Sequence, residues 1–207
     1  MKLYFVLACI FMYISTSAQT WHRMLKEGNF SNSNVTCITS DINQNVWIGT
    51  TNGAYKYNNS GLTYLNTSDG LISNMVSAIS CDLNGKVWIG SPVGLTLWQN
   101  GVTSTFNAQG GMQSQNVKAL AIGENNVLWI GTNSGIIKFN GNSFVQYTTS
   151  SGLVSNSVKN LAYDGINLWI GTLNGLSKYD GASFTNYFTT SGLPNNNINA
   201  LYSNSLN

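Results

Sequence analysis

The ionisable side chains of this chain offer few combinations that could catalyse a reaction. The acidic residues are Glu27, Asp41, Asp69, Asp82, Glu124, Asp164 and Asp180. Glycoside hydrolysis needs two unlike carboxylates facing one bond, and no such pair stands out. His22 is the single histidine, so we expect neither a Ser-His-Asp triad nor a metal site. The sequence therefore predicts no catalytic residue, no metal ligand and no cofactor, and hence a protein that is not an enzyme.

Three of the aspartates recur at one position of a repeat, between two predicted strands. They are Asp41, Asp82 and Asp164. Aspartate at a turn commonly accepts hydrogen bonds from the backbone two residues on. The segment from Asp41 to Asn45 also resembles the start of a calcium loop, but it lacks the glycine at the sixth position and the final glutamate. We therefore expect these aspartates to stabilise hairpins.

Cysteine and lysine residues give two further sets. Cys37 and Cys81 fall at different positions of equivalent predicted strands, so we expect buried free thiols, with a disulfide as the alternative. Cys9 belongs to the N-terminal leader described below. Lys56, Lys138 and Lys178 share one position on another strand. We interpret them as a solvated edge of a sheet, and an anion site is the alternative.

Asparagine recurs in two sets of predicted loops that lie at the same end of the strands. The candidate ligand-binding residues are Asn52, Asn74, Asn116, Asn133, Asn156, Asn174 and Asn197. Their amides suit hydrogen bonding to a neutral small molecule or glycan. The alternative is that they bind their own loop backbones.

The elements that position these residues follow from a repeated Trp-Ile-Gly triplet. It starts at Trp47, Trp88, Trp129 and Trp169, at spacings of 41, 41 and 40 residues. Each copy reads as four short strands, for example 117–121, 127–131, 135–139 and 144–147, with turn residues between them. This period predicts an all-β fold with almost no helix, a β-propeller of four-stranded antiparallel blades.

Each residue of the triplet has an expected structural role. The tryptophan would fill the gap between adjacent blades, the isoleucine would pack the opposite face, and the glycine would let the backbone turn toward the third strand. A ring of sugar-stacking tryptophans is the functional alternative.

The copies divide the chain into a predicted domain at 19–207. The repeats lie near 34–73, 74–115, 116–155 and 156–195, with a partial copy at 196–207 and an unpaired strand around Trp21. Four complete repeats with partial ones at both ends predict an incomplete ring. We interpret the chain as the N-terminal part of a longer product, and a closed ring with a defective last blade is the rival.

Residues 1–18 read as a secretory signal peptide, because Lys2 precedes an apolar stretch and a small-residue cleavage site. The protein is therefore expected to be exported, to the periplasm or the extracellular space. Charged residues make up 8% of the chain. There is no basic patch, which argues against nucleic-acid binding, and no membrane-spanning segment is expected after the signal.

Residues 152–181 carry the pattern Gly152-Leu153, Asp164-Gly165, Leu168-Trp-Ile-Gly-Thr172 and Tyr179-Asp-Gly181. This unit resembles the two-component regulator propeller repeat, and the resemblance extends over nearly all of 19–207. It implies a periplasmic or secreted propeller of the Bacteroidetes type, commonly the sensor half of a hybrid histidine kinase. Such sensors often respond to glycans, and a sensor role would allow a dimer. The family has no catalytic residues within its repeats.

The sequence thus predicts an exported, non-catalytic module that binds a small molecule, a glycan or a protein partner. Two alternatives remain open. One is a secreted propeller enzyme, a polysaccharide lyase or glycosidase. The other is a surface adhesion or structural module.

Overall fold

A computed structural model describes residues 33–203 of the chain. This part is all-β and forms four antiparallel sheets of four strands each, as the repeat predicts. The predicted signal peptide at 1–18, the strand around Trp21 and His22 lie outside the described residues.

Each sheet is a simple meander, in which consecutive strands pair. The first sheet is β1 (Val35–Ser40), β2 (Val46–Thr50), β3 (Gly53–Asn58) and β4 (Gly61–Leu65). The second is β5 (Ala78–Cys81), β6 (Val87–Ser91), β7 (Gly94–Gln99) and β8 (Val102–Phe106). The third is β9 (Val117–Ile122), β10 (Leu128–Thr132), β11 (Gly135–Phe139) and β12 (Phe144–Tyr147). The fourth is β13 (Val158–Tyr163), β14 (Leu168–Thr172), β15 (Leu176–Tyr179) and β16 (Phe184–Tyr187).

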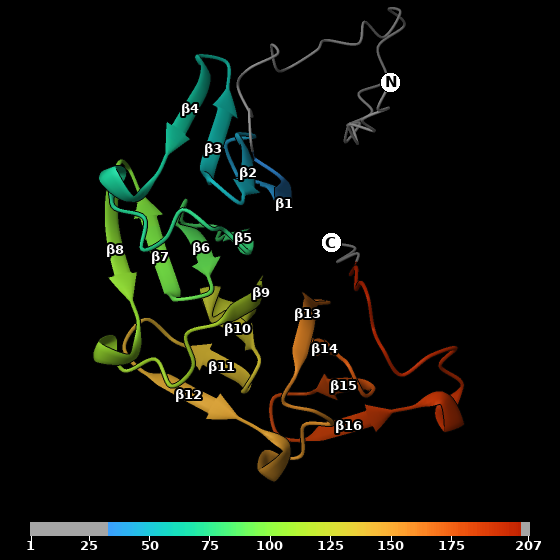
Figure 1. The fold of residues 1–207 in the computed structure, drawn as a ribbon. Coiled ribbons are helices and arrows are strands. Elements are labelled where there is room, and N and C mark those ends of the chain that lie inside the picture. Colours follow the sequence, from blue (N-terminus) through green and yellow to red (C-terminus); the bar gives the residue numbers. More distant parts are fainter. Residues whose placement is uncertain (1–32, 204–207) are drawn as a thin grey trace, which may run out of the picture. The chain divides into compact units, whose positions relative to one another are not determined.

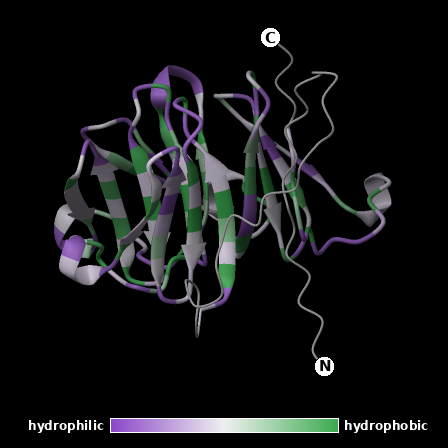
Figure 2. Cartoon of the chain, turned by 90° about the horizontal axis from the view of Figure 1, so that it is seen from above, coloured by the Kyte–Doolittle hydropathy of each residue, from purple (hydrophilic) through white to green (hydrophobic). Residues whose placement is uncertain are grey.

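Neighbouring sheets contact one another through their first strands, β1 with β5, β5 with β9 and β9 with β13. Figure 1 shows these strands on the inner side of the stack and β4, β8, β12 and β16 on its outer side. The predicted strands 135–139 and 144–147 coincide with β11 and β12. Hydrophobic residues lie along the strands and hydrophilic ones gather in the loops at their ends (Figure 2).

The tryptophans of the triplet pack between sheets, as expected. The indole of Trp47 lies 4.9 Å, centroid to centroid, from that of Trp98 in the next sheet. The equivalent pairs in the following copies are Trp88 with Phe139 at 5.7 Å and Trp129 with Tyr179 at 5.6 Å. Trp47, Trp88 and Trp129 are at most 5% exposed, so they are packing residues and offer no face to a sugar. Trp169 is half-buried.

The prediction for the glycine of the triplet is wrong. None of Gly49, Gly90, Gly131 and Gly171 has a positive φ, so these residues do not turn the chain. Instead, a Cβ on Gly131 would lie 2.6 Å from Val158 of the next sheet, and one on Gly171 would lie 2.7 Å from Ile198. The glycine is needed because the first strand of the next copy approaches this backbone closely.

Residues 33–203 contain five short 3₁₀ helices that the sequence did not predict, and four of them lie between consecutive copies. They are η1 (Thr67–Asp69), η2 (Ala108–Gly110), η4 (Thr149–Ser151) and η5 (Thr189–Ser191), whereas η3 (Glu124–Asn126) lies within the third sheet. Each of the four ends on a left-handed glycine, with φ between 86° and 104°. The next residue, Leu71, Met112 or Leu153 in the first three, then enters the core between the sheets.

The segment after Asn195 docks on the fourth sheet as a first strand would. The Ile198 amide donates to the Thr172 carbonyl at 3.0 Å, matching the 2.9 Å bond from Val76 to Thr50 in the first copy. This inter-sheet hydrogen bond is therefore formed at the first sheet and again at the fourth. Ser203 Oγ donates to the Tyr163 carbonyl at 2.7 Å. Within residues 33–203, no helix has the length and apolarity needed to cross a membrane.

Candidate functional site

A buried hydroxyl shapes each loop between the second and third strands. Thr50, Ser91, Thr132 and Thr172 are at most 1% exposed. Each hydroxyl donates a hydrogen bond to the backbone carbonyl three residues later, at 2.8–3.0 Å. It also accepts a hydrogen bond from the backbone amide two residues later. The hydroxyl thereby satisfies backbone polar groups of the loop from the buried side, and the side chains that follow point outward. The side-chain amides of Asn52, Asn133 and Asn174 are exposed and make no hydrogen bond with the described part of the chain.

The asparagines before the first strands divide into two groups. Asn74 Oδ1 accepts the Thr67 amide at 2.8 Å, and Asn156 Oδ1 accepts the Thr149 amide at 2.9 Å. These two side chains therefore hold their own loops, which is the alternative that the sequence left open. In the last copy, Asn196 makes the equivalent bond to Thr189, at 2.8 Å, which leaves Asn197 for another contact.

Asn116 and Asn197 are the remaining members of this set. Asn116 Oδ1 is buried and has no hydrogen-bond partner among residues 33–203. Asn197 Oδ1 accepts a hydrogen bond at 2.9 Å from Nζ of Lys159, a residue of the first strand of the fourth sheet.

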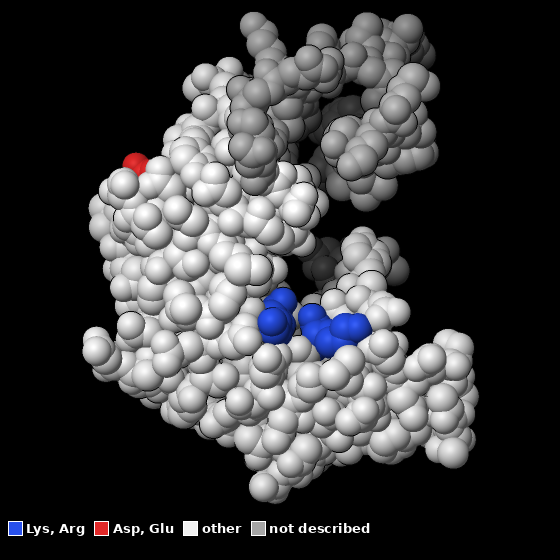
Figure 3. All heavy atoms as spheres, in the orientation of Figure 1, with Lys and Arg blue, Asp and Glu red and all other residues white. Residues whose placement is uncertain are grey.

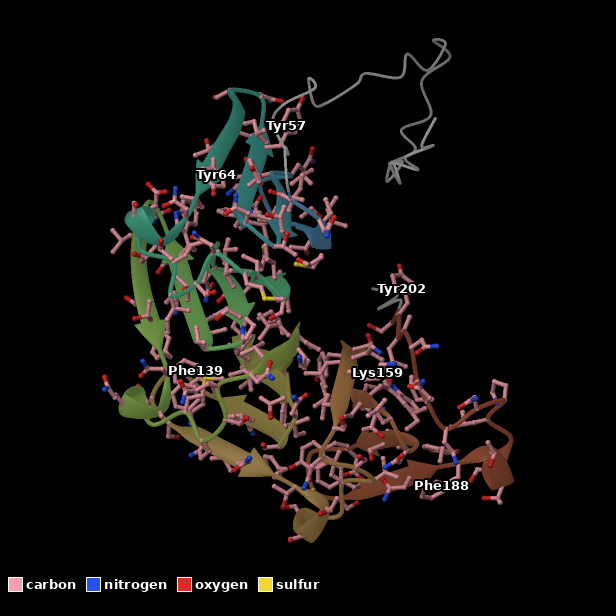
Figure 4. The ribbon with its side chains drawn as sticks, in the orientation of Figure 1. Tyr57, Tyr64, Phe139, Lys159, Phe188 and Tyr202 are labelled. Atoms are coloured by element: carbon pink, nitrogen blue, oxygen red, sulfur yellow. The ribbon has the colours of Figure 1, made fainter. Side chains whose placement is uncertain are left out.

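A pocket of about 300 Å³ lies between the third and fourth sheets, at the end of the strands that carries these loops. It is lined by Lys118, Asn133, Ser157, Val158, Lys159 and Leu173. Figure 3 shows basic side chains at the inner surface of the stack, beside β9 and β13. Lys159 is labelled there in Figure 4, beside the segment that carries Tyr202.

The structure thus brings together two of the seven predicted asparagines. Asn133 lines the pocket, and Asn197 bonds a lysine of its wall. The other five do not line it. They are Asn52, Asn74, Asn116, Asn156 and Asn174.

Lys118 and Lys159 were not predicted from the sequence. The signal is the residue that follows the recurring valine at 35, 76, 117 and 158, which is Thr36, Ser77, Lys118 and then Lys159 in successive copies. Of the three lysines that the sequence did indicate, Lys56 and Lys138 pack on indoles. Lys56 Nζ lies 4.9 Å from the ring centre of Trp98, and Lys138 Nζ lies 5.6 Å from that of Trp129. Cation–π contact accounts for these two without an anion.

The recurrent aspartates stabilise hairpins, as predicted. Asp82 Oδ1 accepts the amides of Asn84 and Lys86, each at 2.9 Å. Asp164 Oδ1 accepts the amides of Ile166 and Asn167. Among residues 33–203, no three His, Cys, Asp or Glu side chains are grouped as a metal would require.

Two of these aspartates also bind the tryptophan of their own copy, which the sequence did not reveal. The indole N–H of Trp47 donates to Asp41 at 3.0 Å, and that of Trp169 donates to Asp164 at 2.6 Å. The Asn167 amide and the Trp169 indole lower the pKa of Asp164 to about 2. For Asp41, burial raises the pKa, but the bonds from Trp47 and Asn45 together leave it below its usual value.

The acid and thiol groups that remain have structural surroundings too. Asp69 Oδ2 accepts the Asn66 amide at 3.0 Å within the capping box of η1. Cys37 and Cys81 are free thiols, as expected, although they are half-buried rather than fully buried. Burial raises the pKa of Cys81 to about 12, and the carboxylates of Asp41 and Asp82 contribute.

Comparison with known proteins agrees with this architecture. Residues 29–52 match the family described as two component regulator propeller. No curated protein matches the chain significantly in sequence.

Among solved structures, the chain is similar to the extracellular domain of the hybrid two component system BT3049 from B. thetaiotaomicron. The TM-score is 0.70 at 23% identity, over 79% of this chain and 24% of that one. It is also similar to virginiamycin B lyase from Staphylococcus aureus, with a TM-score of 0.64 at 14% identity over 83% of this chain and 60% of that one. A third similar structure is PorZ, a surface component of the type-IX secretion system of Porphyromonas gingivalis. The TM-score is 0.61 at 17% identity, over 91% of this chain and 32% of that one.

The chain spans about a quarter of the length of the BT3049 domain. At these identities the similarity concerns the fold. The repeat family recognised in the sequence is confirmed: residues 29–52 match a two component regulator propeller repeat, and the four sheets have the fold of extracellular propeller domains of hybrid two component systems.

Proposed function

We propose that this chain is an exported, non-catalytic propeller module that binds a small saccharide at the loop end of its third and fourth sheets. It would serve as part of an extracellular sensor. The observation that carries the proposal is the pocket between these sheets, where the exposed amide of Asn133 stands beside two lysines and a serine. Its volume of about 300 Å³ is at the lower end of the range for small-molecule sites.

The hydrogen bonds that hold the two loops around the pocket support a role in ligand binding. Thr132 and Thr172 hold the two loops that flank the pocket by buried hydrogen bonds of 2.9 Å and 2.8 Å. Asn133 and Leu173 follow these threonines directly. A site fixed before binding loses less conformational entropy when a ligand enters.

The sensor role is supported by the similarity to the extracellular domains of two hybrid two component systems. The absence of a catalytic role is supported by the surroundings of the acids, since Asp41, Asp82 and Asp164 are bonded to backbone amides at hairpins. These hairpins lie at the opposite end of the strands from the pocket.

Calorimetric titration of the chain with a panel of oligosaccharides tests the proposal. We expect at least one saccharide to bind, without turnover, and Asn133→Ala to weaken it about tenfold, as expected for one lost hydrogen bond. Asn142→Ala is the matched control, because Asn142 is an exposed amide in the β11–β12 hairpin at the other end of the same sheet. Equal binding by the wild type and the Asn133 variant, or no binding across the panel, would contradict the proposed site.

A further inference from the structure

We infer that the pocket recognises an anionic group of its ligand, a carboxylate or sulfate carried by a saccharide, between Lys118 and Lys159. The inference rests on the proposed function and specifies the chemistry of the ligand at the same site. Both ammonium groups belong to residues that line the pocket, one from β9 and one from β13.

The two lysines interrupt a structural role that the repeat assigns to their position. In the first two copies, the residue there is a hydroxyl donor to the next sheet. Thr36 Oγ1 donates to the Val76 carbonyl at 2.8 Å, and Ser77 Oγ donates to the Val117 carbonyl at 2.7 Å. In the third and fourth copies, lysine stands at this position, and the wall of the pocket lies between these two copies.

The fourth copy keeps the inter-sheet bond by another residue. Asn160 Nδ2 donates to the Ile198 carbonyl at 3.0 Å, which is the bond that the hydroxyls make in the first two copies. Lys159 is therefore released from that task. Its ammonium group donates to Asn197 Oδ1 at 2.9 Å and to Asn199 Oδ1 at 2.7 Å, and both acceptors are neutral.

The charge of these lysines is the feature that packing leaves unexplained. A neutral side chain of similar length would satisfy the two asparagine oxygens as well. Two lysine residues that line one open depression, with neutral residues beside them, create a positive potential that attracts anions. On the face shown in Figure 3, the visible acidic surface lies away from the basic side chains.

The rest of the wall suits a sugar that carries the charge. The Asn133 amide and the Ser157 hydroxyl offer neutral hydrogen bonds, while Val158 and Leu173 provide apolar surface. Leu173 is 46% exposed, so this apolar surface is accessible. Charge-assisted bonds from lysine would hold the carboxylate or sulfate, and the remaining groups would orient the ring.

Calorimetry with three probes tests the inference: digalacturonate, a sulfated galactose disaccharide and the uncharged galactose disaccharide. We expect at least one anionic probe to bind about tenfold or more tightly than the neutral probe, as one charge-assisted bond would provide. The affinity should fall when salt is raised from about 50 mM to about 300 mM, because screening shortens the range of the attraction. The carboxylate and sulfate arms identify which anion the site prefers.

Lys118→Gln and Lys159→Gln should each lower the affinity for the anionic probe about tenfold and leave the affinity for the neutral probe unchanged. Lys178→Gln removes the same charge from β15 in the fourth sheet and should change neither affinity. Glutamine retains a donor for Asn197 and Asn199, so a purely structural role of Lys159 predicts wild-type affinity.

Protection of lysine amines from acetylation in the unmutated protein gives an independent measure if a variant does not fold. The bound anionic probe should protect Lys118 and Lys159 relative to Lys178. Equal affinity for the neutral and anionic probes, or protection of other lysines, would overturn the anionic site while leaving the proposed function in place. Absence of binding by all three probes and by the neutral oligosaccharide panel would overturn both.

Discussion

At the residue scale, an aspartate in the first and fourth copies joins a hairpin to the tryptophan of its own copy. Asp164 accepts two backbone amides with one oxygen and the Trp169 indole with the other. One carboxylate thus couples a turn to the packing of its blade. In the third copy Gly123 takes this position, and a Cβ there would lie 2.8 Å from Nε1 of Trp129.

This coupling predicts a pH dependence of stability. Asp164 has a pKa of about 2 in the folded protein, below the value of about 3.9 of an unfolded chain. Because the folded pKa is lower, the stabilisation is present above about pH 4 and is lost as the pH falls toward 2. We expect the stability difference between wild type and Asp164→Asn to shrink from pH 5 to about pH 2 in urea unfolding. A difference that is constant across this range would contradict the assignment.

The residues of the hairpins could be predicted because their role repeats with the sequence period. The role of Lys118 and Lys159 could not be predicted, because these residues depart from the repeat. The departure is recognised only from the inter-sheet hydrogen bonds that Thr36 and Ser77 make at the same position. The division between Asn196 and Asn197 was hidden for a related reason. Adjacent asparagines are equivalent in sequence, and only the bond to Thr189 separates them.

At the scale of elements, the buried hydroxyl residue that ends each second strand shapes the loop that follows. It is a threonine in three copies and Ser91 in the second. Thr132→Val would keep the shape of the side chain but remove the donor to Gly135 and the acceptor for Ser134. We expect a loss of about 1–3 kcal/mol in the free energy of unfolding, because two backbone groups lose their partner. Thr132→Ser retains the hydroxyl and should lose less. Chemical denaturation measures both, and equal losses would show that the methyl group, rather than the hydroxyl, matters.

The contact between sheets makes a second prediction. Gly131→Ala would place a methyl group 2.6 Å from Val158, so the next sheet must shift. We expect destabilisation of about 1–3 kcal/mol from overpacking, read from the midpoint of thermal or urea unfolding. Gly110→Ala is the control, since a Cβ there meets nothing within 4 Å and its φ is not positive. Similar stability of the Gly131 variant and the control would refute the close approach.

The strands themselves could be predicted from alternation and turn residues, and β11 and β12 match their predicted ranges. The 3₁₀ helices between copies could not, because three residues such as Thr149–Ser151 carry no periodic signal of their own. The role of the triplet glycine was misjudged because a glycine in a sequence indicates a turn as readily as a close contact. Only the position of Val158 distinguishes the two.

At the scale of the whole molecule, each sheet stabilises its neighbour through one recurring set of contacts. An indole packs against an aromatic residue of the next sheet. The backbone of the triplet glycine lies in close contact with a valine or isoleucine side chain of the next copy. Stability in such a stack is a sum of nearest-neighbour terms, so individual loop residues are free to change without loss of the fold. The binding site proposed here is built from such changes, at the junction of the third and fourth copies.

Amide hydrogen exchange of the chain, with and without a saturating concentration of whichever anionic probe binds more tightly, tests that site most directly. We expect slower exchange in three segments around the pocket, 132–134, 156–159 and 172–174, and unchanged exchange in the β11–β12 hairpin at 140–143. Protection confined to the hairpins at the opposite end, or spread over sheets distant from the pocket, would contradict it.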